Sequence, residues 1–129
     1  MPTHNIIDNN HERRDMTPKI QTILTELHRR FEALYGERLV RIVLFGSQAR
    51  GDAEPGSDID VLVVLKSPVS PCEEIARTIN DVADIWLEHN EVIACVFVSE
   101  EQCERERSPL LLNVRREGVE IYETCESRV

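Results

Sequence analysis

The sequence predicts an α/β fold in which one sheet is covered by helices. Two observations carry this prediction. Short apolar runs rich in branched residues have the composition of strands, and the longer segments between them repeat apolar residues at helical spacing. The chain of 129 residues has the size of one small domain and shows no internal repeat. We expect the order helix, strand, strand, helix, strand, helix, helix, strand.

The composition is that of an acidic globular protein. Hydrophobic residues make up 41% and charged residues 30% of the chain, and the net charge is −9. Direct nucleic-acid binding is disfavoured, because clustered Lys and Arg are what grip a phosphate backbone. A basic protein partner fits this charge better.

Nothing in the sequence favours a membrane or a secreted location. No apolar run approaches the roughly 18 residues needed to span a bilayer, and the N-terminal segment lacks the apolar region of a signal peptide. The cysteines are scattered without metal-binding spacing: Cys72, Cys95, Cys103 and Cys125. We therefore expect a cytoplasmic protein with reduced thiols and no membrane insertion.

One domain is expected over residues 17–123, between a polar tail at 1–16 and a charged tail at 124–129. It opens with a helix for which Thr17 is a suitable N-cap, with Pro18 at the first helical position and Gly36 as the stop. The apolar residues of this helix recur at helical spacing: Ile20, Ile23, Leu24, Leu27, Phe31 and Leu34.

Two strands follow this helix. Leu39–Phe45 is almost continuously apolar, which predicts that both of its faces are covered. A Gly-Ser pair then breaks the strand, and the connection opens with a helical turn at residues 47–50. The second strand is expected at Asp58–Leu65.

The second half of the chain carries three helix starts. Ser70 has the S-x-x-E spacing of a capping box, with Pro at the first helical position. The helix that it opens has one apolar stripe, Ile75, Ile79, Val82 and Trp86, which we expect in the core. A third strand is expected at Val92–Val98. Ser99 repeats the capping-box pattern for a short acidic helix.

The last elements are a helix and a short strand. Ser108 and Pro109 start another helix, which runs to a stop at Gly118. Val119–Tyr122 supplies a fourth, short strand.

The polar residues that interrupt this pattern gather between positions 46 and 60. Gly46 allows a ligand to approach the backbone closely, and Ser47 stands at a helix start whose N–H groups favour a phosphate. Asp58 and Asp60 lie one residue apart, so on a strand they share a face and suit Mg²⁺ as oxygen ligands. Arg50 can hold a phosphate or a departing pyrophosphate through its guanidinium.

Each of these features alone carries little weight. A single Gly-Ser pair, an Asp-x-Asp pair or an arginine is most often an ordinary surface feature. Their combination is different, because both pairs flank strands in the expected order. Asp60 also falls inside the apolar run IDVLVVL, where a carboxylate needs a metal or a charged partner.

The segment GSQARGDAEPGSDIDVLVVL resembles the signature of the nucleotidyltransferase superfamily related to DNA polymerase beta, and in particular the minimal nucleotidyltransferases, or MNT proteins. The resemblance implies a nucleotidyltransferase fold with a mixed sheet of about four strands and a site at the strand ends. It implies that Asp58 and Asp60 bind Mg²⁺ and are catalytic. Gly46 and Ser47, with Arg50 and Ser57, are the candidate nucleotide-binding residues.

The resemblance also implies a partner. MNT proteins typically pair with a small helical HEPN protein, usually a ribonuclease toxin, and act as its antitoxin. In some pairs the MNT protein transfers AMP from ATP to a tyrosine of the HEPN protein. We therefore expect a HEPN-type partner and ATP or another NTP as substrate; the sequence leaves self-association open.

One position departs from the family pattern. Active members commonly carry a third carboxylate on a later strand, where it binds metal and serves as general base. The matching position in VIACVFV is Ala94. Glu91 is close in sequence but an odd number of residues away, so in a regular strand it faces the other side.

Two functions remain open on the sequence. The first is an enzyme that transfers NMP, with AMP preferred, to a protein hydroxyl; the second is a weak or inactive antitoxin that works by binding its partner. The two Asp residues favour the first, and Ala94 favours the second. Transfer to an aminoglycoside and template-directed polymerisation are disfavoured, because this length leaves no room for an added substrate domain.

Overall fold

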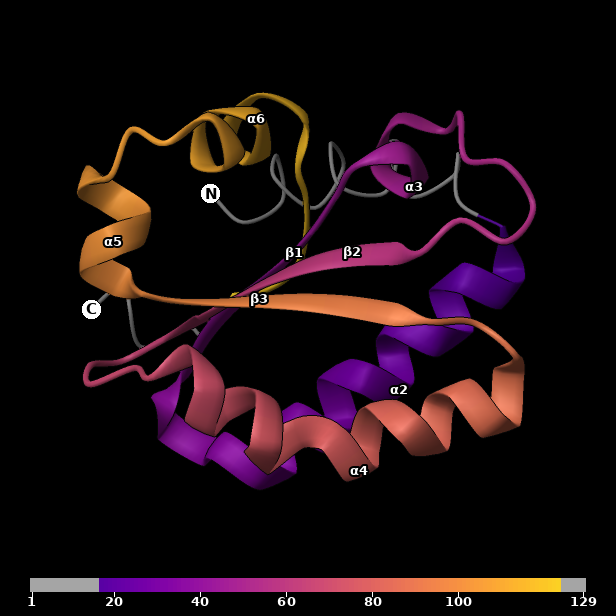
Figure 1. Cartoon of the computed structure of the whole chain (residues 1–129), viewed down its shortest axis with the longest axis horizontal. Helices are drawn as coiled ribbons and strands as arrows, with labels where there is room; N and C mark the ends of the chain where they lie inside the picture. The colour runs from indigo at the N-terminus through magenta and orange to yellow at the C-terminus, as the bar shows by residue number, and fades with distance from the viewer. Residues whose placement is uncertain (1–16, 124–129) are drawn as a thin grey trace.

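The computed structural model describes residues 17–123. The tails expected at 1–16 and 124–129, and Cys125 with them, lie outside the described residues. One sheet separates two groups of helices (Figure 1). Helices α2 (Pro18–Tyr35) and α4 (Pro71–His89) lie on one side of it, and α5 (Glu100–Arg105) and α6 (Pro109–Glu117) on the other. The α/β class predicted from the sequence is confirmed.

The sheet is mixed and has four strands in the order β3-β2-β1-β4. Its strands are β1 (Leu39–Phe45), β2 (Ile59–Leu65), β3 (Ile93–Ser99) and β4 (Val119–Glu123). Strand β1 is antiparallel to both β2 and β4, whereas β2 and β3 are parallel and joined through α4. Each expected strand is present, with boundaries shifted by one residue at most.

The larger core lies between the sheet and α2. Thr17 caps this helix by accepting a hydrogen bond from the N–H of Ile20 at 3.2 Å, and Gly36 ends it with φ +56°. A 3₁₀ turn, Gly36–Arg38, then leads into β1. The predicted stripe is buried except for its last member, Leu34, which is 39% exposed. The same core takes alternate residues of β2: Ile59, Val61, Val63 and Leu65.

A smaller core fills the other face of the sheet. It contains the remaining β2 residues Leu62 and Val64 together with Leu111 and Val114 of α6. The expected caps form here: Ser99 and Gln102 make a reciprocal capping box, and Ser108 accepts from the N–H of Leu111. Asp60 alternates with Val61 along β2, so it belongs to this second face.

The sequence interpretation of α4 is wrong in two respects. Ser70 makes no side-chain capping bond. Of the stripe expected in the core, Val82 packs partly buried against it, but Ile75, Ile79 and Trp86 are 49%, 56% and 50% exposed. The helix instead buries the side that faces α2, with Glu74 accepting a hydrogen bond from the hydroxyl of Tyr35 at 2.8 Å. The buried side of α4 thus combines two polar residues, Glu74 and Thr78, with Ile85, which lies in the larger core.

None of the helices in the described region combines the length and apolarity needed to cross a membrane.

Candidate functional site

The candidate site forms where β1 ends and β2 begins. Phe45, the last residue of β1, pairs with Asp60, so Gly46 lies directly against the Asp60 side chain. Gly46 has φ +77°, a conformation that side chains other than glycine rarely adopt. A Cβ atom at this position would overlap Oδ2 of Asp60. Glycine is therefore favoured here for two separate reasons: the positive φ, and the lack of room for a side chain beside Asp60.

Gly46 is also the N-cap of α3 (Ser47–Arg50), the helical turn expected from the sequence. The carbonyl of Gly46 accepts from the N–H groups of Ala49 and Arg50, both at 3.1 Å. The carbonyl of Ser47 in turn accepts from Gly51 at 3.0 Å. These bonds hold the turn at the end of β1, next to Asp60.

The negative charge of Asp60 is only partly balanced by its surroundings. Burial raises the pKa of Asp60 above its ordinary value of 3.8, and the nearby negative charge of Asp58 raises it further. The charge of Arg50 lowers the pKa and offsets part of this effect. Asp58 itself lies just before β2 and is exposed.

This pair fits a divalent cation. Asp58 and Asp60 are hard oxygen donors, and a divalent ion would relieve their mutual repulsion. Within residues 17–123, no third acid, His or Cys comes close enough to complete a three-ligand group with them. Mg²⁺ that is also coordinated by substrate phosphates usually has only one or two carboxylate ligands from the protein.

Arg50 stands at the rim of the site and already has two carboxylate partners. Its guanidinium contacts Asp52 and Glu117, each at 3.2 Å. Glu117 belongs to α6, so this ion pair connects the site to the helix on the same face of the sheet. No sequence pattern identified Glu117, because 67 positions separate it from Arg50.

Ser57 organises the loop that leads into β2. Its hydroxyl accepts a hydrogen bond from the N–H of Glu54 at 3.1 Å, and its own N–H donates to the Glu54 carbonyl at 3.0 Å. The structure thus brings Gly46, Asp58 and Asp60 together and places Ser57 in the loop before them. A role of Ser57 in nucleotide binding stays a prediction.

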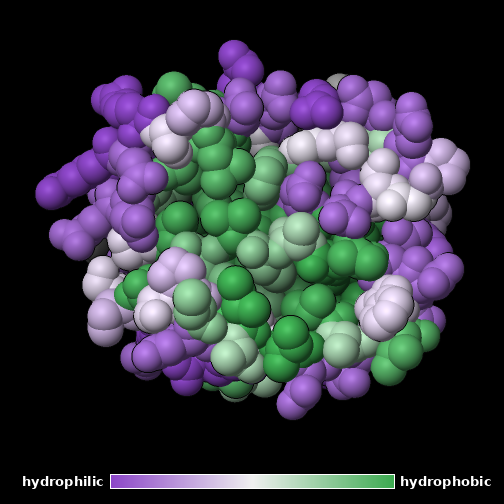
Figure 2. All heavy atoms as spheres, viewed as in Figure 1, coloured by the Kyte–Doolittle hydropathy of each residue, from purple (hydrophilic) through white to green (hydrophobic). Residues whose placement is uncertain are grey.

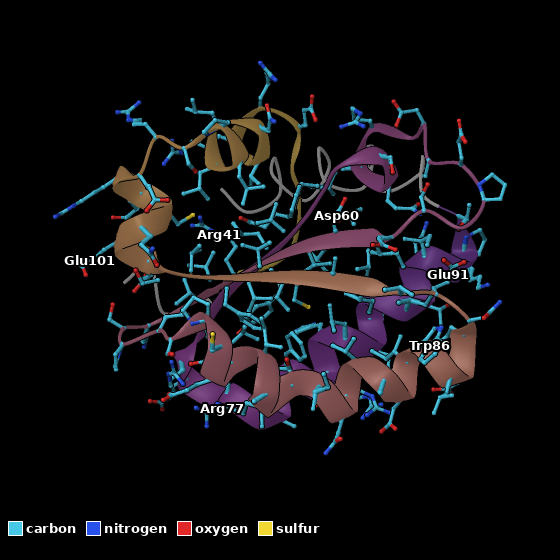
Figure 3. The ribbon with its side chains drawn as sticks, viewed as in Figure 1. Arg41, Asp60, Arg77, Trp86, Glu91 and Glu101 are labelled. Atoms are coloured by element: carbon cyan, nitrogen blue, oxygen red, sulfur yellow. The ribbon has the colours of Figure 1, made fainter. Side chains whose placement is uncertain are left out.

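The third-carboxylate position lies beside Asp60. Ala94 on β3 is the register partner of Asp60, so both side chains belong to the same face of the sheet. Glu91 is engaged elsewhere: its Oε2 lies 3.2 Å from Nζ of Lys19 on α2, the helix that covers the opposite face. Asp60 and Glu91 are labelled in Figure 3. Ala94 therefore leaves this flank of the site without a carboxylate, and Glu91 does not replace it.

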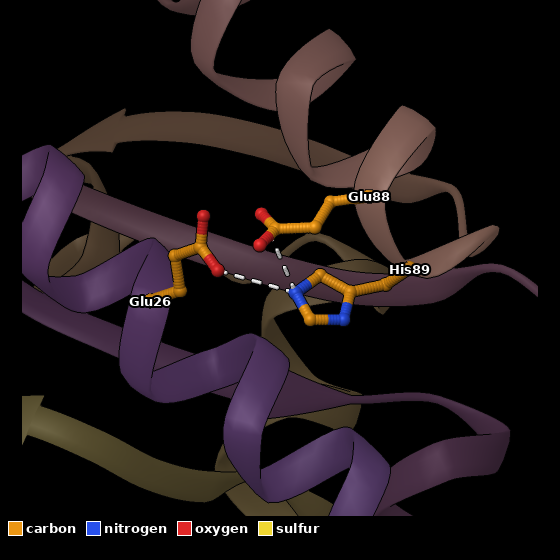
Figure 4. A group of neighbouring side chains, drawn as sticks. All are labelled: Glu26, Glu88 and His89. Atoms are coloured by element: carbon orange, nitrogen blue, oxygen red, sulfur yellow. Dashed lines mark hydrogen bonds and ion pairs between the residues drawn. The ribbon is translucent and has the colours of Figure 1, made fainter.

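A second polar cluster lies between α2 and α4 (Figure 4). Nε2 of His89 lies 3.1 Å from Oε1 of Glu26 and 3.8 Å from Oε1 of Glu88, and these are the three residues in the described region close enough to share an ion. Arg30 also contacts Glu26 at 3.0 Å. The hydrogen bond to His89 is the main cause that lowers the pKa of Glu26. Since a cation already neutralises this cluster, we interpret it as an interhelical ion-pair network.

The Nucleotidyltransferase domain family matches residues 20–114. A "Putative protein adenylyltransferase" of Methanocaldococcus jannaschii is 40% identical over 48 residues. That match covers 37% of this chain and 48% of the relative, so the chain aligns with about half of the relative's length.

Solved structures share the fold at low sequence identity. A chain of a toxin–antitoxin complex with AMP-PNP superposes with a TM-score of 0.60 at 16% identity, over 81% of this chain and 76% of the other. A chain from the complex of a tri-AMPylated Shewanella oneidensis HEPN toxin with its MNT antitoxin gives 0.54 at 16% identity, over 84% and 76%. These likenesses establish the fold.

The family match spans most of the described region and includes both strands of the site, Gly46 and the Asp pair. It agrees with the mixed four-stranded sheet and with the position of Asp60 at the start of β2. The chain belongs to the nucleotidyltransferase domain family.

Proposed function

We propose that this protein transfers AMP from Mg-ATP to a hydroxyl group of a protein partner, and that the partner is a HEPN-type toxin. The observation that carries the proposal is the contact between Gly46 and Asp60. A glycine in a conformation unfavourable for other residues makes room for a half-buried carboxylate with a second acid close by. Such an arrangement is costly unless a ligand uses it.

The residues of the site suit nucleotidyl transfer. The acceptor oxygen forms a bond to the α-phosphorus, the bond from that phosphorus to the bridging oxygen breaks, pyrophosphate leaves, and the hydroxyl proton passes to water. Asp58 and Asp60 would hold the metal, which when bound neutralises phosphate charge. The α3 turn after Gly46 would receive phosphate oxygens, and Arg50 would move from its carboxylate partners to the leaving pyrophosphate.

The choice of AMP and of a HEPN partner rests on the comparisons. The M. jannaschii relative is named as a protein adenylyltransferase, and the S. oneidensis neighbour comes from a complex with a tri-AMPylated HEPN toxin. The acidic charge of this chain also suits a ribonuclease partner, since an RNA-binding protein carries a basic surface.

A second candidate is an antitoxin that binds its partner and transfers nothing at a useful rate. Ala94 favours it, because the register partner of Asp60 offers no general base. A base typically contributes about 10²- to 10⁴-fold, so its absence slows transfer without forbidding it. Positioning and metal charge supply the rest of the acceleration.

One experiment separates the two candidates. The protein is purified with the product of its neighbouring gene and incubated with Mg²⁺ and ATP labelled at either the α- or the γ-phosphate. AMP transfer labels the partner from α-labelled ATP alone, whereas phosphorylation would label it from γ-labelled ATP. The Asp58→Ala, Asp60→Ala double variant should lose the label, and Glu54→Ala, which removes an exposed acid of the preceding loop, should keep it.

Label that persists in the double variant, or that never appears with wild-type protein, would contradict the transfer proposal. If the double variant still suppresses the partner's ribonuclease activity without label, the binding candidate is favoured instead. Circular dichroism of both variants guards against loss of folding as the cause.

A further inference from the structure

Arg50 and Glu117 form an ion pair that joins the candidate site to α6. Nη1 of Arg50 lies 3.2 Å from Oε1 of Glu117, and Nε of Arg50 lies 3.2 Å from Oδ2 of Asp52. The two acids belong to different parts of the chain. Asp52 is exposed and follows Arg50 by two residues, in the same short segment, whereas Glu117 is the last residue of α6. Of these two pairs, only the one with Glu117 connects Arg50 to a separate helix.

The packing of α6 fixes the position of Glu117. The next residue, Gly118, lies so close to the sheet that a Cβ atom there would overlap Cγ1 of Val43 and the carbonyl oxygen of Val114. The N–H of Gly118 also donates to that carbonyl at 2.8 Å, and Val114 itself is buried in the smaller core. Glu117 therefore stays in place when the Arg50 side chain turns toward a ligand.

The guanidinium of Arg50 acts on the site from its rim. Its positive charge lowers the pKa of Asp60, so the two groups are close enough to interact electrostatically. Arg50 is also the last residue of α3, the turn that begins after Gly46. The Arg50 side chain is 44% exposed, and Figure 2 shows mostly hydrophilic residues along the rim where α3 and α6 lie. A phosphate can therefore reach this guanidinium from solvent.

We propose that Glu117 is a positioning residue that competes with nucleotide phosphate for Arg50 and thereby sets the affinity of the site for nucleotide. This inference rests on the proposed function, in which Arg50 binds the leaving pyrophosphate. A bidentate contact between arginine and phosphate takes two neighbouring N–H groups. Asp52 and Glu117 already occupy Nε and Nη1 of Arg50, so phosphate must displace a carboxylate or bind beside its negative charge. Because Asp52 lies in the same segment as Arg50, the partner exchanged for phosphate is Glu117.

The exchange has a small energetic cost, so it can be reversed in each cycle of binding. Glu117 keeps a cation beside it when Arg50 leaves, because Nη2 of Arg116 lies 3.9 Å from its Oε2. The Arg50–Glu117 pair is itself partly exposed, with 44% and 28% of the two side chains open to solvent. The strength of such an exposed pair corresponds to a change of up to about fivefold in an equilibrium constant. Competition by Glu117 should therefore weaken nucleotide binding by a factor of this size.

The test measures nucleotide affinity in the full chain, without a protein partner. The probe is Mg²⁺ with α,β-methylene-ATP, in which a methylene group replaces the oxygen whose bond must break, so it binds without transfer. In calorimetric titrations, Glu117→Gln should bind this probe about two- to fivefold more tightly than wild type. Its thermal midpoint without nucleotide should fall, by about a few degrees at most, because the ion pair is lost. A merely structural role of Glu117 would lower both affinity and stability.

Glu120→Gln is the matched control. Oε1 of Glu120 on β4 lies 3.2 Å from Nε of Arg41, and the Glu120 side chain is 35% exposed, similar to Glu117. The substitution removes the same charge and weakens a similar ion pair, but one that does not involve Arg50. It should leave the affinity for the probe nearly unchanged. In an Arg50→Gln background, which should itself bind the probe less tightly, Glu117→Gln should no longer tighten binding.

Three results would overturn the role of Glu117 and leave the proposed function standing. The first is an equal gain of affinity in Glu117→Gln and Glu120→Gln, which net charge alone would explain. The second is weaker binding or no change in Glu117→Gln. The third is a gain that persists in the Arg50→Gln background. A wild-type chain that binds no Mg²⁺ with α,β-methylene-ATP would instead overturn this inference and the proposed function together.

Discussion

The two flanks of Asp60 differ sharply in what they contribute to the site. On the β1 side lies Gly46, which has φ +77° and no side chain that would overlap the Asp60 carboxylate. On the β3 side, Ala94 occupies the register position that faces the same carboxylate and offers a methyl group. The first flank fits closely around the Asp60 carboxylate, whereas the second places no ionisable group beside it.

In the proposed transfer site, the half that would hold metal and phosphate and the half that would activate the acceptor lie on opposite sides of one strand, β2. Strand β2 lies between β1 and β3 and pairs with both. The backbone on each side of Asp60 is therefore held by the sheet, and the two sides differ in the residues that they place next to it. A chain with the first half intact keeps a reason to bind a metal nucleotide. On the proposed function, the rate of transfer then depends on whether a general base comes from the β3 side of the site or from a bound partner.

The largest effect is expected from adding a carboxylate at position 94, on the β3 side of Asp60. Ala94→Asp puts a carboxylate next to Asp60, and we expect label transfer from α-labelled ATP to rise about 10²-fold or more, the usual contribution of a general base. Ala94→Asn has the same size without the charge and should give no gain. Equal rates for the two variants would show that the β3 flank does not limit the reaction.

The next largest effect is expected from disturbing the contact between Gly46 and Asp60. Gly46→Ala forces a Cβ atom onto Oδ2 of Asp60, and we expect transfer to fall on the order of 10- to 100-fold, as misplacement of a catalytic group does. The strained conformation should also lower the free energy of unfolding by about 1–3 kcal/mol.

Gly56→Ala separates these two causes. Gly56 also has a positive φ, +86°, but a Cβ atom there meets nothing within 4 Å. It should cost stability in urea unfolding while leaving the transfer rate near that of the wild type. A similar loss of transfer in both variants would mean that backbone strain, and not Asp60, accounts for the effect.

A smaller effect is expected on stability and its pH dependence. Because the folded state raises the pKa of Asp60, mainly through burial, this group contributes stability below its ordinary pKa of 3.8 and loses that contribution as pH rises through the folded-state value. Asp60→Asn should therefore be more stable than wild type at neutral pH without metal, on the order of 1 kcal/mol. The advantage should vanish at acid pH.

Urea unfolding at a series of pH values measures this difference, with Asp58→Asn, at an exposed position, as the matched comparison. Added Mg²⁺ should stabilise the wild type and not Asp60→Asn. An Asp60→Asn protein that is less stable than wild type at neutral pH would contradict the assignment of Asp60 as an uncompensated carboxylate.

The smallest effect is expected at Glu91. Glu91→Gln removes one carboxylate of the Lys19–Glu91 ion pair, whose lysine is half exposed, so the free energy of unfolding should change by less than about 1 kcal/mol. Transfer should be unaffected, because Glu91 pairs with the helix on the opposite face. A transfer rate that falls in Glu91→Gln would show that this residue reaches the site after all.

Much of the fold could be predicted because its signals are local. Thr17, Ser99 and Ser108 cap their helices through bonds to residues three positions along the chain, and Gly36 ends α2 for a conformational reason of its own. The strands were identified by composition, and their expected boundaries were correct to within one residue. Ser70 shows the limit of local patterns, since the capping spacing is present and the bond is not.

The candidate site was predictable to the extent that it is contiguous in sequence. Gly46 and Asp58 lie in the connection between β1 and β2, and Asp60 lies at the start of β2, which pairs directly with β1. The partners of Arg50 were not predictable, because Glu117 reaches it from a helix 67 residues later. That contact exists because α6 lies over the same face of the sheet as the site.

By itself, the sequence determined the order of the elements, the family signature and the absence of a carboxylate at Ala94, because each of these is written in residue identity or short spacing. Only the tertiary structure decided which side of α4 faces inward. Helical periodicity defines an apolar stripe but not what lies beside it, and here the side of α4 that turns inward carries Ile85 in the core, Glu74 in a buried bond to Tyr35, and Asp81 in a partly buried bond to Arg30. The stripe with Trp86 is left at the open edge of β3 for that reason.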